Sequence, residues 1–212
     1  MITIINGGTQ GLGEATARRL LATGFTSGVA LVGRSADRGE ALVVTGLGST
    51  TWDAAAAGDH PNNFYLWGGM GGAAMVGLGL AQAQPDRRVV VITGDGEMLM
   101  GIGALATIAA AAVQNLAIVV IDNERYGETG MQETATAHGV DLALMAQGAG
   151  FKQTATLCAM DEVEAWLPKV YGEPGPVFVD VKVSTDPVPM VLPERDGTWI
   201  RARFRQSVLG DD

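Results

Sequence analysis

Runs of apolar residues alternate with stretches that favour helices along most of this chain. Four short apolar runs predict buried strands at 42–45, 88–93, 116–121 and 177–183. Between them, small and apolar residues at helical spacing predict helices, the longest at 97–113. Strands that alternate with helices are typical of parallel sheets covered on both faces. The pattern therefore predicts an α/β fold with a doubly wound, mostly parallel sheet and helices on both faces.

The same pattern divides the chain into three parts. A small strand-helix-strand pattern predicts a Rossmann-like extension over 1–41, the main domain is expected over 42–190, and a Pro-bearing, amphipathic tail over 191–212. The other elements expected in the main domain are an extended segment at 64–67, a helix ending near 83, a loop at 127–139, and helices at 142–148 and 161–171.

Composition limits the classes of function. The chain has 212 residues, 47% of them apolar, which suits one folded domain with a sizeable core. A formal charge of −9 argues against nucleic acid as a partner, because phosphate binding needs clustered Lys and Arg. The single cysteine, Cys158, excludes a disulfide framework or a metal cluster held by several cysteines of this chain.

No apolar run reaches the roughly 20 residues that span a bilayer. The apolar start of the chain also lacks the basic residues and the cleavage site of a signal peptide. We therefore expect a cytoplasmic protein without membrane attachment.

Two polar side chains follow directly after two successive predicted strands. Asp95 comes after the strand at 88–93, Asn123 comes after the strand at 116–121, and a helix connects them. A right-handed crossover brings both strand ends to one edge of the sheet, where open α/β sheets bind ligands. Carboxylate and amide oxygens suit Mg²⁺, and the carbonyl of Arg125 would add a third oxygen. The sequence therefore predicts a magnesium site of Asp95, Asn123 and Arg125, with the alternative that Asp-Gly and Asp-Asn here are only the turns that commonly end strands.

The arrangement of these residues resembles the signature of thiamine diphosphate-dependent enzymes. Gly94-Asp95-Gly96 followed by Asp122-Asn123 is similar to the GDG motif and the paired Asn of that family. Asp122 replaces the first Asn of the pair, whereas Asn123 keeps the ligand position. Tyr126-Gly127 lies where the family often has an aromatic residue and a glycine. The resemblance implies that thiamine diphosphate and Mg²⁺ are the cofactors, with the diphosphate bound through the metal.

A second part of the resemblance lies upstream, at Gly68-Gly69-Met70-Gly71. In the family, a large apolar residue here supports the bent cofactor, which implies this role for Met70. The carbonyl of Gly68 would accept a hydrogen bond from the aminopyrimidine, and the helix opened by Glu97 would direct N–H groups at the diphosphate. The resemblance implies the following cofactor-binding residues: Gly68, Met70, Gly94, Asp95, Gly96, Glu97, Asn123, Tyr126 and Gly127.

Two stretches, 46–53 and 122–130, resemble the β subunit of sulfopyruvate decarboxylases and the matching half of phosphonopyruvate decarboxylases. This implies a carbon-carbon lyase that acts on a small 2-oxo acid, although carboligation of the acetolactate synthase type uses the same cofactor chemistry and stays open. Enzymes of this family also need a pyrimidine-binding half with an activating glutamate. We therefore expect an α subunit that supplies this half, in a homo- or hetero-oligomer.

His138 and Glu128 are the candidates for a direct catalytic role within this chain. Both belong to the loop at 127–139, which follows the expected metal ligand. A solvent-exposed or helix-capping role is an equal alternative for His138. The activating glutamate itself is expected from the partner.

The start of the chain suggests a different function. Asn6–Gly13 resembles the dinucleotide fingerprint of short-chain dehydrogenases, and Gly33-Arg34-Ser35 lies where that family often reads a 2′-phosphate. The chain has no Tyr-x-x-x-Lys pair, so the hydride-transfer residues of that family are missing. A nucleotide-binding or reductase-related module through residues 6–13 stays as an alternative, and so does a non-catalytic thiamine domain.

Overall fold

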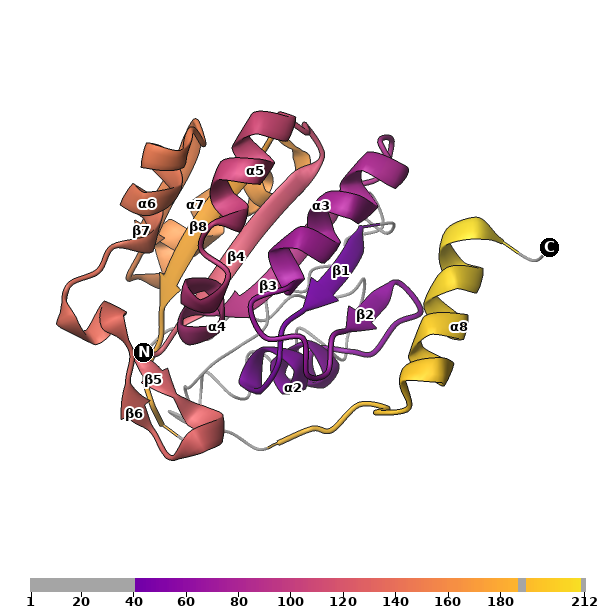
Figure 1. The fold of residues 1–212 in the computed structure, drawn as a ribbon, viewed down its shortest axis with the longest axis horizontal. Helices are drawn as coiled ribbons and strands as arrows, with labels where there is room; N and C mark the ends of the chain where they lie inside the picture. The colour runs from indigo at the N-terminus through magenta and orange to yellow at the C-terminus, as the bar shows by residue number, and fades with distance from the viewer. Residues whose placement is uncertain (1–40, 187–189, 211–212) are drawn as a thin grey trace.

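The computed structural model describes residues 41–186 and 190–210, which form a sheet between two layers of helices (Figure 1). The strands, in order across the sheet, are β2 (Asn63–Tyr65), β1 (Leu42–Thr45), β3 (Val89–Gly94), β4 (Leu116–Asp122), β8 (Val177–Lys182) and β7 (Gln153–Leu157). Every neighbouring pair in this sheet is parallel.

Helices cover both faces of the sheet (Figure 1). One face carries α3 (Ala73–Ala83), α5 (Ala104–Ala111) and α6 (Leu142–Ala149), and the other carries α2 (Ser49–Ala56) and α7 (Met160–Gly172). The short helix α4 (Asp95–Met100) begins where β3 ends. The predicted doubly wound α/β fold is confirmed.

Two cores follow from the alternation of side chains along the strands. In β3, Val90 and Ile92 pack into the core that includes Val163 of α7, whereas Val91 packs into the core that includes Leu78 of α3. These side chains are almost fully buried. Burial of each stabilises the fold by roughly 1.5–3 kcal/mol relative to exposure. The central strands thus anchor the two helical layers and fix the edge at which they end.

The helix predicted over 97–113 is interrupted. α4 ends at Met100 and α5 begins at Ala104, with a turn at Gly101–Gly103 between them. A Cβ atom at Gly101 would lie 2.0 Å from the carbonyl oxygen of Gly71. The loop before α3 therefore passes too close to position 101 for any side chain. The prediction of one continuous helix was wrong, because glycines at 101 and 103 weaken the helix at this turn.

Two local features differ from the simple predicted pattern. No strand was predicted at β7, where Gln153–Leu157 has no apolar run, since an edge strand paired only with β8 tolerates polar residues. The loop expected at 127–139 contains ordered structure. Its elements, with the strand that precedes it, are β5 (Arg125–Tyr126), η1 (Gly127–Thr129), β6 (Gln132–Glu133) and η2 (Ala135–His138).

Most of the expected tail forms α8 (Gly197–Leu209), which lies beside β2 at the edge of the sheet (Figure 1). The rings of Phe204 and Phe64 lie 5.3 Å apart. Arg203 Nη1 is 2.6 Å from Asp59 Oδ2, and Arg203 Nη2 donates a hydrogen bond to the carbonyl of Asn63. This helix therefore packs on the same sheet as the rest of the described chain.

The dinucleotide-like segments, Asn6–Gly13 and Gly33-Arg34-Ser35, lie outside the described residues, as does almost all of the extension expected over 1–41. Among the described residues, no helix combines the length and the apolar character needed to cross a bilayer.

Candidate functional site

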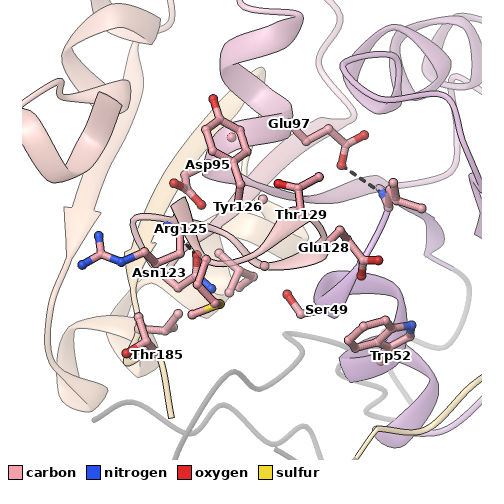
Figure 2. A pocket seen from close by; sticks show the side chains of 18 of the residues that line it. Ser49, Trp52, Asp95, Glu97, Asn123, Arg125, Tyr126, Glu128, Thr129 and Thr185 are labelled. Atoms are coloured by element: carbon pink, nitrogen blue, oxygen red, sulfur yellow. Dashed lines mark hydrogen bonds between the residues drawn. The ribbon is translucent and has the colours of Figure 1, made fainter. Parts of the chain in front are cut away.

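A cavity of about 530 Å³ opens at the carboxyl edge of the sheet (Figure 2). Its walls come from the segments that follow β1, β2, β3, β4 and β8. β1 and β3 are neighbours, but the chain continues from β1 to one side of the sheet and from β3 to the other. Such a switch in strand order is where open α/β sheets bind ligands, and the volume suits a small molecule.

The cavity brings together most of the residues expected from the sequence. Gly68 is not among the residues that line it, and its backbone φ is +85°. His138 is not among them either, and its side chain is 68% exposed and lies 3.2 Å from Glu133. The predicted residues that do line the cavity are Met70, Gly94, Asp95, Gly96, Glu97, Asn123, Arg125, Tyr126, Gly127 and Glu128.

Asp95 is buried at the point where β3 passes into α4. Its Oδ2 accepts hydrogen bonds from Thr134 Oγ1 at 2.5 Å and from Thr136 Oγ1 at 3.2 Å. Burial raises the pKa of Asp95 to about 6, and the charge of Asp122 contributes to the rise while the threonine hydrogen bonds oppose it. The two hydroxyls hold one oxygen of the carboxylate in place.

Asn123 and Arg125 follow the end of the neighbouring strand. Asn123 Oδ1 accepts a hydrogen bond from the backbone N–H of Arg125 at 3.0 Å, which orients the amide and leaves a second lone pair on the oxygen. The Arg125 guanidinium is engaged elsewhere, with Glu133 at 3.2 Å and the carbonyl of Glu124 at 2.9 Å. The backbone carbonyl is therefore the group that Arg125 can offer to a metal.

Glu97 connects two loops of the cavity wall. Its Oε2 accepts hydrogen bonds from Thr93 Oγ1 at 2.9 Å and from the backbone N–H of Leu47 at 3.1 Å, the contact drawn as a dashed line in Figure 2. A Cβ atom at Gly46 would lie 1.6 Å from this oxygen. Burial raises the pKa of Glu97. The side chain thus fixes the loop after β1 to the turn after β3.

Several glycines in the cavity wall leave the backbone without side chains. A Cβ atom at Gly94 or Gly127 would meet no atom within 4 Å. At Gly96 a Cβ atom would lie only 2.3 Å from the ring of Tyr126, which packs on this turn. A ligand can therefore approach the backbone beside Asp95 closely.

The other end of the cavity lies at α2, where Trp52 and Asp53 line the wall. Trp52 Nε1 and Asp53 Oδ2 are buried, and no described residue gives either atom a hydrogen-bond partner. Burial raises the pKa of Asp53 to about 8. Glu128 extends toward this end, in the direction of Ser49 and Trp52 in Figure 2.

A cluster of charges lies beneath the Asp95 end. Lys182 Nζ is 2.6 Å from Asp122 Oδ2, 3.5 Å from Glu124 Oε1 and 3.9 Å from Asp180 Oδ2. Asp122 is fully buried, and its Oδ1 also accepts a hydrogen bond from Thr136 Oγ1 at 2.9 Å. Burial would lower the pKa of Lys182, but its hydrogen bond to Asp122 and the surrounding carboxylates raise it, so the ammonium stays charged.

Sequence reasoning missed four residues of this arrangement: Asp53, Thr134, Thr136 and Lys182. Only Lys182 had a usable signal, because it is one of two charged residues, with Asp180, in the otherwise apolar predicted strand 177–183. In the folded chain, β8 places it in register with Asp122. The threonines lie in a loop whose path the apolar pattern does not define.

The donor set fits Mg²⁺ with a diphosphate. Within residues 41–186 and 190–210, no three His, Cys, Asp or Glu side chains gather at a metal site. The expected set is instead one carboxylate, one amide and one backbone carbonyl, and Mg²⁺ commonly completes such a set with phosphate oxygens and water. The bare glycine backbone beside Asp95 leaves space for the phosphate.

Comparisons with known proteins agree with this geometry. The family model described as "Thiamine pyrophosphate enzyme, C-terminal TPP binding domain" matches residues 46–181. The chain is 37% identical over 169 residues to sulfopyruvate decarboxylase subunit beta of Methanothermobacter thermautotrophicus, a match that covers 80% of this chain and 88% of that subunit.

Two longer proteins match over part of their length. Phosphonopyruvate decarboxylase of Streptomyces viridochromogenes is 36% identical over 144 residues, which cover 68% of this chain and 36% of that protein. A solved structure from Mycobacterium smegmatis, described as a thiamin diphosphate-dependent enzyme, matches with a TM-score of 0.57 and 28% identity, over 69% of this chain and 29% of that one. The chain therefore belongs to the thiamine pyrophosphate enzymes and contains their C-terminal TPP-binding domain.

Proposed function

We propose that this chain is the diphosphate-binding subunit of a thiamine diphosphate- and Mg²⁺-dependent decarboxylase of a small 2-oxo acid. The observation that carries the proposal is the position of Asp95 and Asn123 at the carboxyl ends of β3 and β4, within one cavity. Similarity to a sulfopyruvate decarboxylase β subunit and to a phosphonopyruvate decarboxylase supports a substrate of that kind.

In this proposal Asp95 and Asn123 hold Mg²⁺ through side-chain oxygens. Thr134 and Thr136 engage Oδ2 of Asp95, so Oδ1 is the oxygen directed to the metal. Asn123 contributes the second lone pair of Oδ1, and Arg125 its carbonyl. A bound cation favours the ionised form of Asp95, whose pKa burial raises to about 6.

The diphosphate lies between the start of α2 and the turn after β3. Gly48 and Ser49 line the cavity, and no side chain of residues 41–186 or 190–210 caps the first turn of α2, so its free N–H groups favour an anion. Gly94 and Gly127 allow close approach of the phosphate oxygens. When bound, thiamine diphosphate supplies an electron sink for the electron pair left as carbon dioxide departs.

Exposed methionines on the cavity wall support the need for a partner subunit. Met70, Met100, Met131 and Met190 line the cavity and each expose 45–55% of their surface. Exposed apolar surface around a cleft is typical of an interaction site. We propose that an α subunit with the pyrimidine-binding domain covers this surface, supplies the activating glutamate and leaves Met70 in contact with the cofactor.

The test is co-expression of the chain with a candidate pyrimidine-domain subunit. Calorimetry would measure thiamine diphosphate binding with Mg²⁺ and with EDTA, and gas release would be measured with sulfopyruvate, phosphonopyruvate and pyruvate. We expect Mg²⁺-dependent binding and carbon dioxide release from an anionic 2-oxo acid. Asp95→Ala should weaken binding by roughly 100-fold or more, since metal affinity depends on each ligand.

The matched control is Asp86→Ala, which alters an exposed aspartate far from the cavity lining and should bind as the wild type does. Normal Mg²⁺-dependent binding by Asp95→Ala would contradict the proposal. A product that joins two 2-oxo acids after decarboxylation would instead assign the chain to a carboligase of the acetolactate synthase type.

A further inference from the structure

Asp122 adds a second buried carboxylate next to the proposed metal ligands. It directly precedes Asn123 and is fully buried. Both of its oxygens have partners. Lys182 Nζ lies 2.6 Å from Oδ2, and Oδ1 accepts hydrogen bonds from Thr136 Oγ1 and from the backbone N–H of Glu124, both at 2.9 Å. A buried charge needs such partners, because removal from water is costly.

Hydrogen bonds through two threonines connect Asp122 to Asp95. Thr136 Oγ1 lies 2.8 Å from Thr134 Oγ1, and both hydroxyls contact Asp95 Oδ2. A connected series of contacts thus runs from Lys182 on β8 to Asp122 on β4, then through the threonines beside η2 to Asp95 after β3. The two threonine hydroxyls carry only two protons, and two carboxylates accept from them.

We propose that Lys182 is a positioning residue for the metal site, an inference that rests on the proposed function. By neutralising Asp122, Lys182 lets that carboxylate share the threonine hydroxyls with Asp95, so that Asp95 keeps one oxygen held and the other directed to the metal. Without Lys182, the unpaired charge of Asp122 repels Asp95 and competes with it for the hydroxyl protons. A positive side chain is needed at position 182 because the buried residue at position 122 is a negatively charged aspartate.

A purely electrostatic effect predicts the opposite result. A positive charge near a cation site weakens cation binding, so loss of Lys182 would then strengthen Mg²⁺ binding. Loss of the Asp122 charge would weaken binding, and the two effects would add in a double variant. If Lys182 acts by positioning, its loss weakens Mg²⁺ binding, and a second change, Asp122→Asn, restores it. Asn at 122 still accepts the Thr136 hydrogen bond and needs no counter-ion.

The experiment uses the full chain co-expressed with the candidate α subunit. Four variants are compared with the wild type: Lys182→Met, Lys182→Arg, Asp122→Asn and Asp122→Asn/Lys182→Met. The readout is the Mg²⁺ concentration that gives half-maximal thiamine diphosphate binding, with thermal unfolding of the unliganded protein measured in parallel.

We expect Lys182→Met to raise the half-maximal Mg²⁺ concentration by roughly 10- to 100-fold, as for other groups that orient metal ligands. Lys182→Arg should recover part of this loss, and the double variant should recover most of it. If Lys182→Met does not fold, the proposal is decided by the double variant, which should fold and bind Mg²⁺ with the cofactor as the wild type does.

Three results would overturn the proposal. The first is tighter or unchanged Mg²⁺ dependence in Lys182→Met. The second is a double variant no better than Lys182→Met, or one that fails to bind. The third is coupling between the two positions in thermal unfolding without any change in Mg²⁺ dependence, which would assign the pair to fold stability. Wild-type protein that binds no cofactor would instead refute the proposed function itself.

Discussion

The two ends of the cavity differ in how their buried polar groups are satisfied. At one end, Asp95 and Asp122 accept hydrogen bonds from two threonines, and Lys182 balances their charge. At the other end, Trp52 Nε1 and Asp53 Oδ2 are buried with no partner among the described residues. A paired buried group supports the fold, whereas an unpaired one destabilises it. Both side-chain oxygens of Asp180 and Oε1 of Glu97 are also buried without a hydrogen-bond partner among the described residues. The contrast is therefore between the Asp95–Asp122 pair, whose partners the chain supplies itself, and the Trp52–Asp53 pair, which it leaves unpaired.

The largest effect that we expect on stability comes from Asp53→Asn. Burial raises the pKa of Asp53 from 3.8 to about 8, so the folded chain binds more protons than the unfolded chain between these values. The free energy of unfolding therefore falls as pH rises from about 4 to about 8. Asp53→Asn should remove this loss and so raise the free energy of unfolding at pH 8, by at most on the order of 5 kcal/mol. Urea unfolding at pH 5 and pH 8 measures it.

The control for this prediction is Asp86→Asn, because Asp86 is an exposed aspartate and should keep the wild-type pH dependence. If Asp53→Asn lost stability between pH 5 and pH 8 as steeply as the wild type does, Asp53 would not be the strained group.

We expect a smaller effect on stability from Thr136→Val, at the Asp95 end of the cavity. This change removes the hydroxyl that contacts Asp95 and Asp122, and should destabilise the chain by about 1–3 kcal/mol. Thr156→Val is the matched control, since Thr156 Oγ1 is buried without a partner in the described part of the chain, and its loss should be neutral or stabilising. Thermal unfolding of both variants measures the difference. Equal destabilisation would show that the contacts of the Thr136 hydroxyl with the two carboxylates add no stability.

The smallest effect is expected from His138→Ala. The side chain is 68% exposed and outside the cavity lining, and it contacts Glu133 at the surface. Stability should stay within about 0.5 kcal/mol of the wild type, and Mg²⁺-dependent cofactor affinity should not change. A clear loss of cofactor affinity, measured by calorimetry in the co-expressed enzyme, would show that His138 itself reaches the site in the assembly.

Most of the sheet could be predicted from the sequence because its central strands are buried on both faces. The run at 116–121 differs from β4 by one residue, and the run at 42–45 coincides with β1. β7 was missed because an edge strand has fewer neighbours to select apolar side chains. The absence of a side chain at Gly101 depends on close contact with Gly71, which no local pattern contains.

Local motifs found the residues at the strand ends but not those that hold them. Asp95 and Asn123 follow apolar strands, so spacing and chemistry mark them as candidate metal ligands, and the family resemblance strengthens that prediction. The partners of the carboxylates are distant in sequence: Thr134 lies 39 residues from Asp95, and Lys182 lies 60 residues from Asp122. Only the folded sheet brings these pairs together, so a single sequence gives no local pattern that joins them.

The position of α8 has a consequence for protein production. Strand β2 is an edge strand, and Arg203 of α8 occupies the carbonyl of Asn63 on it while Phe204 covers Phe64. A chain cut at the expected boundary near 190 would lose this cover. Its free strand edge and uncovered aromatic ring would then favour pairing between copies and aggregation. Expression of the domain therefore requires that α8 be kept.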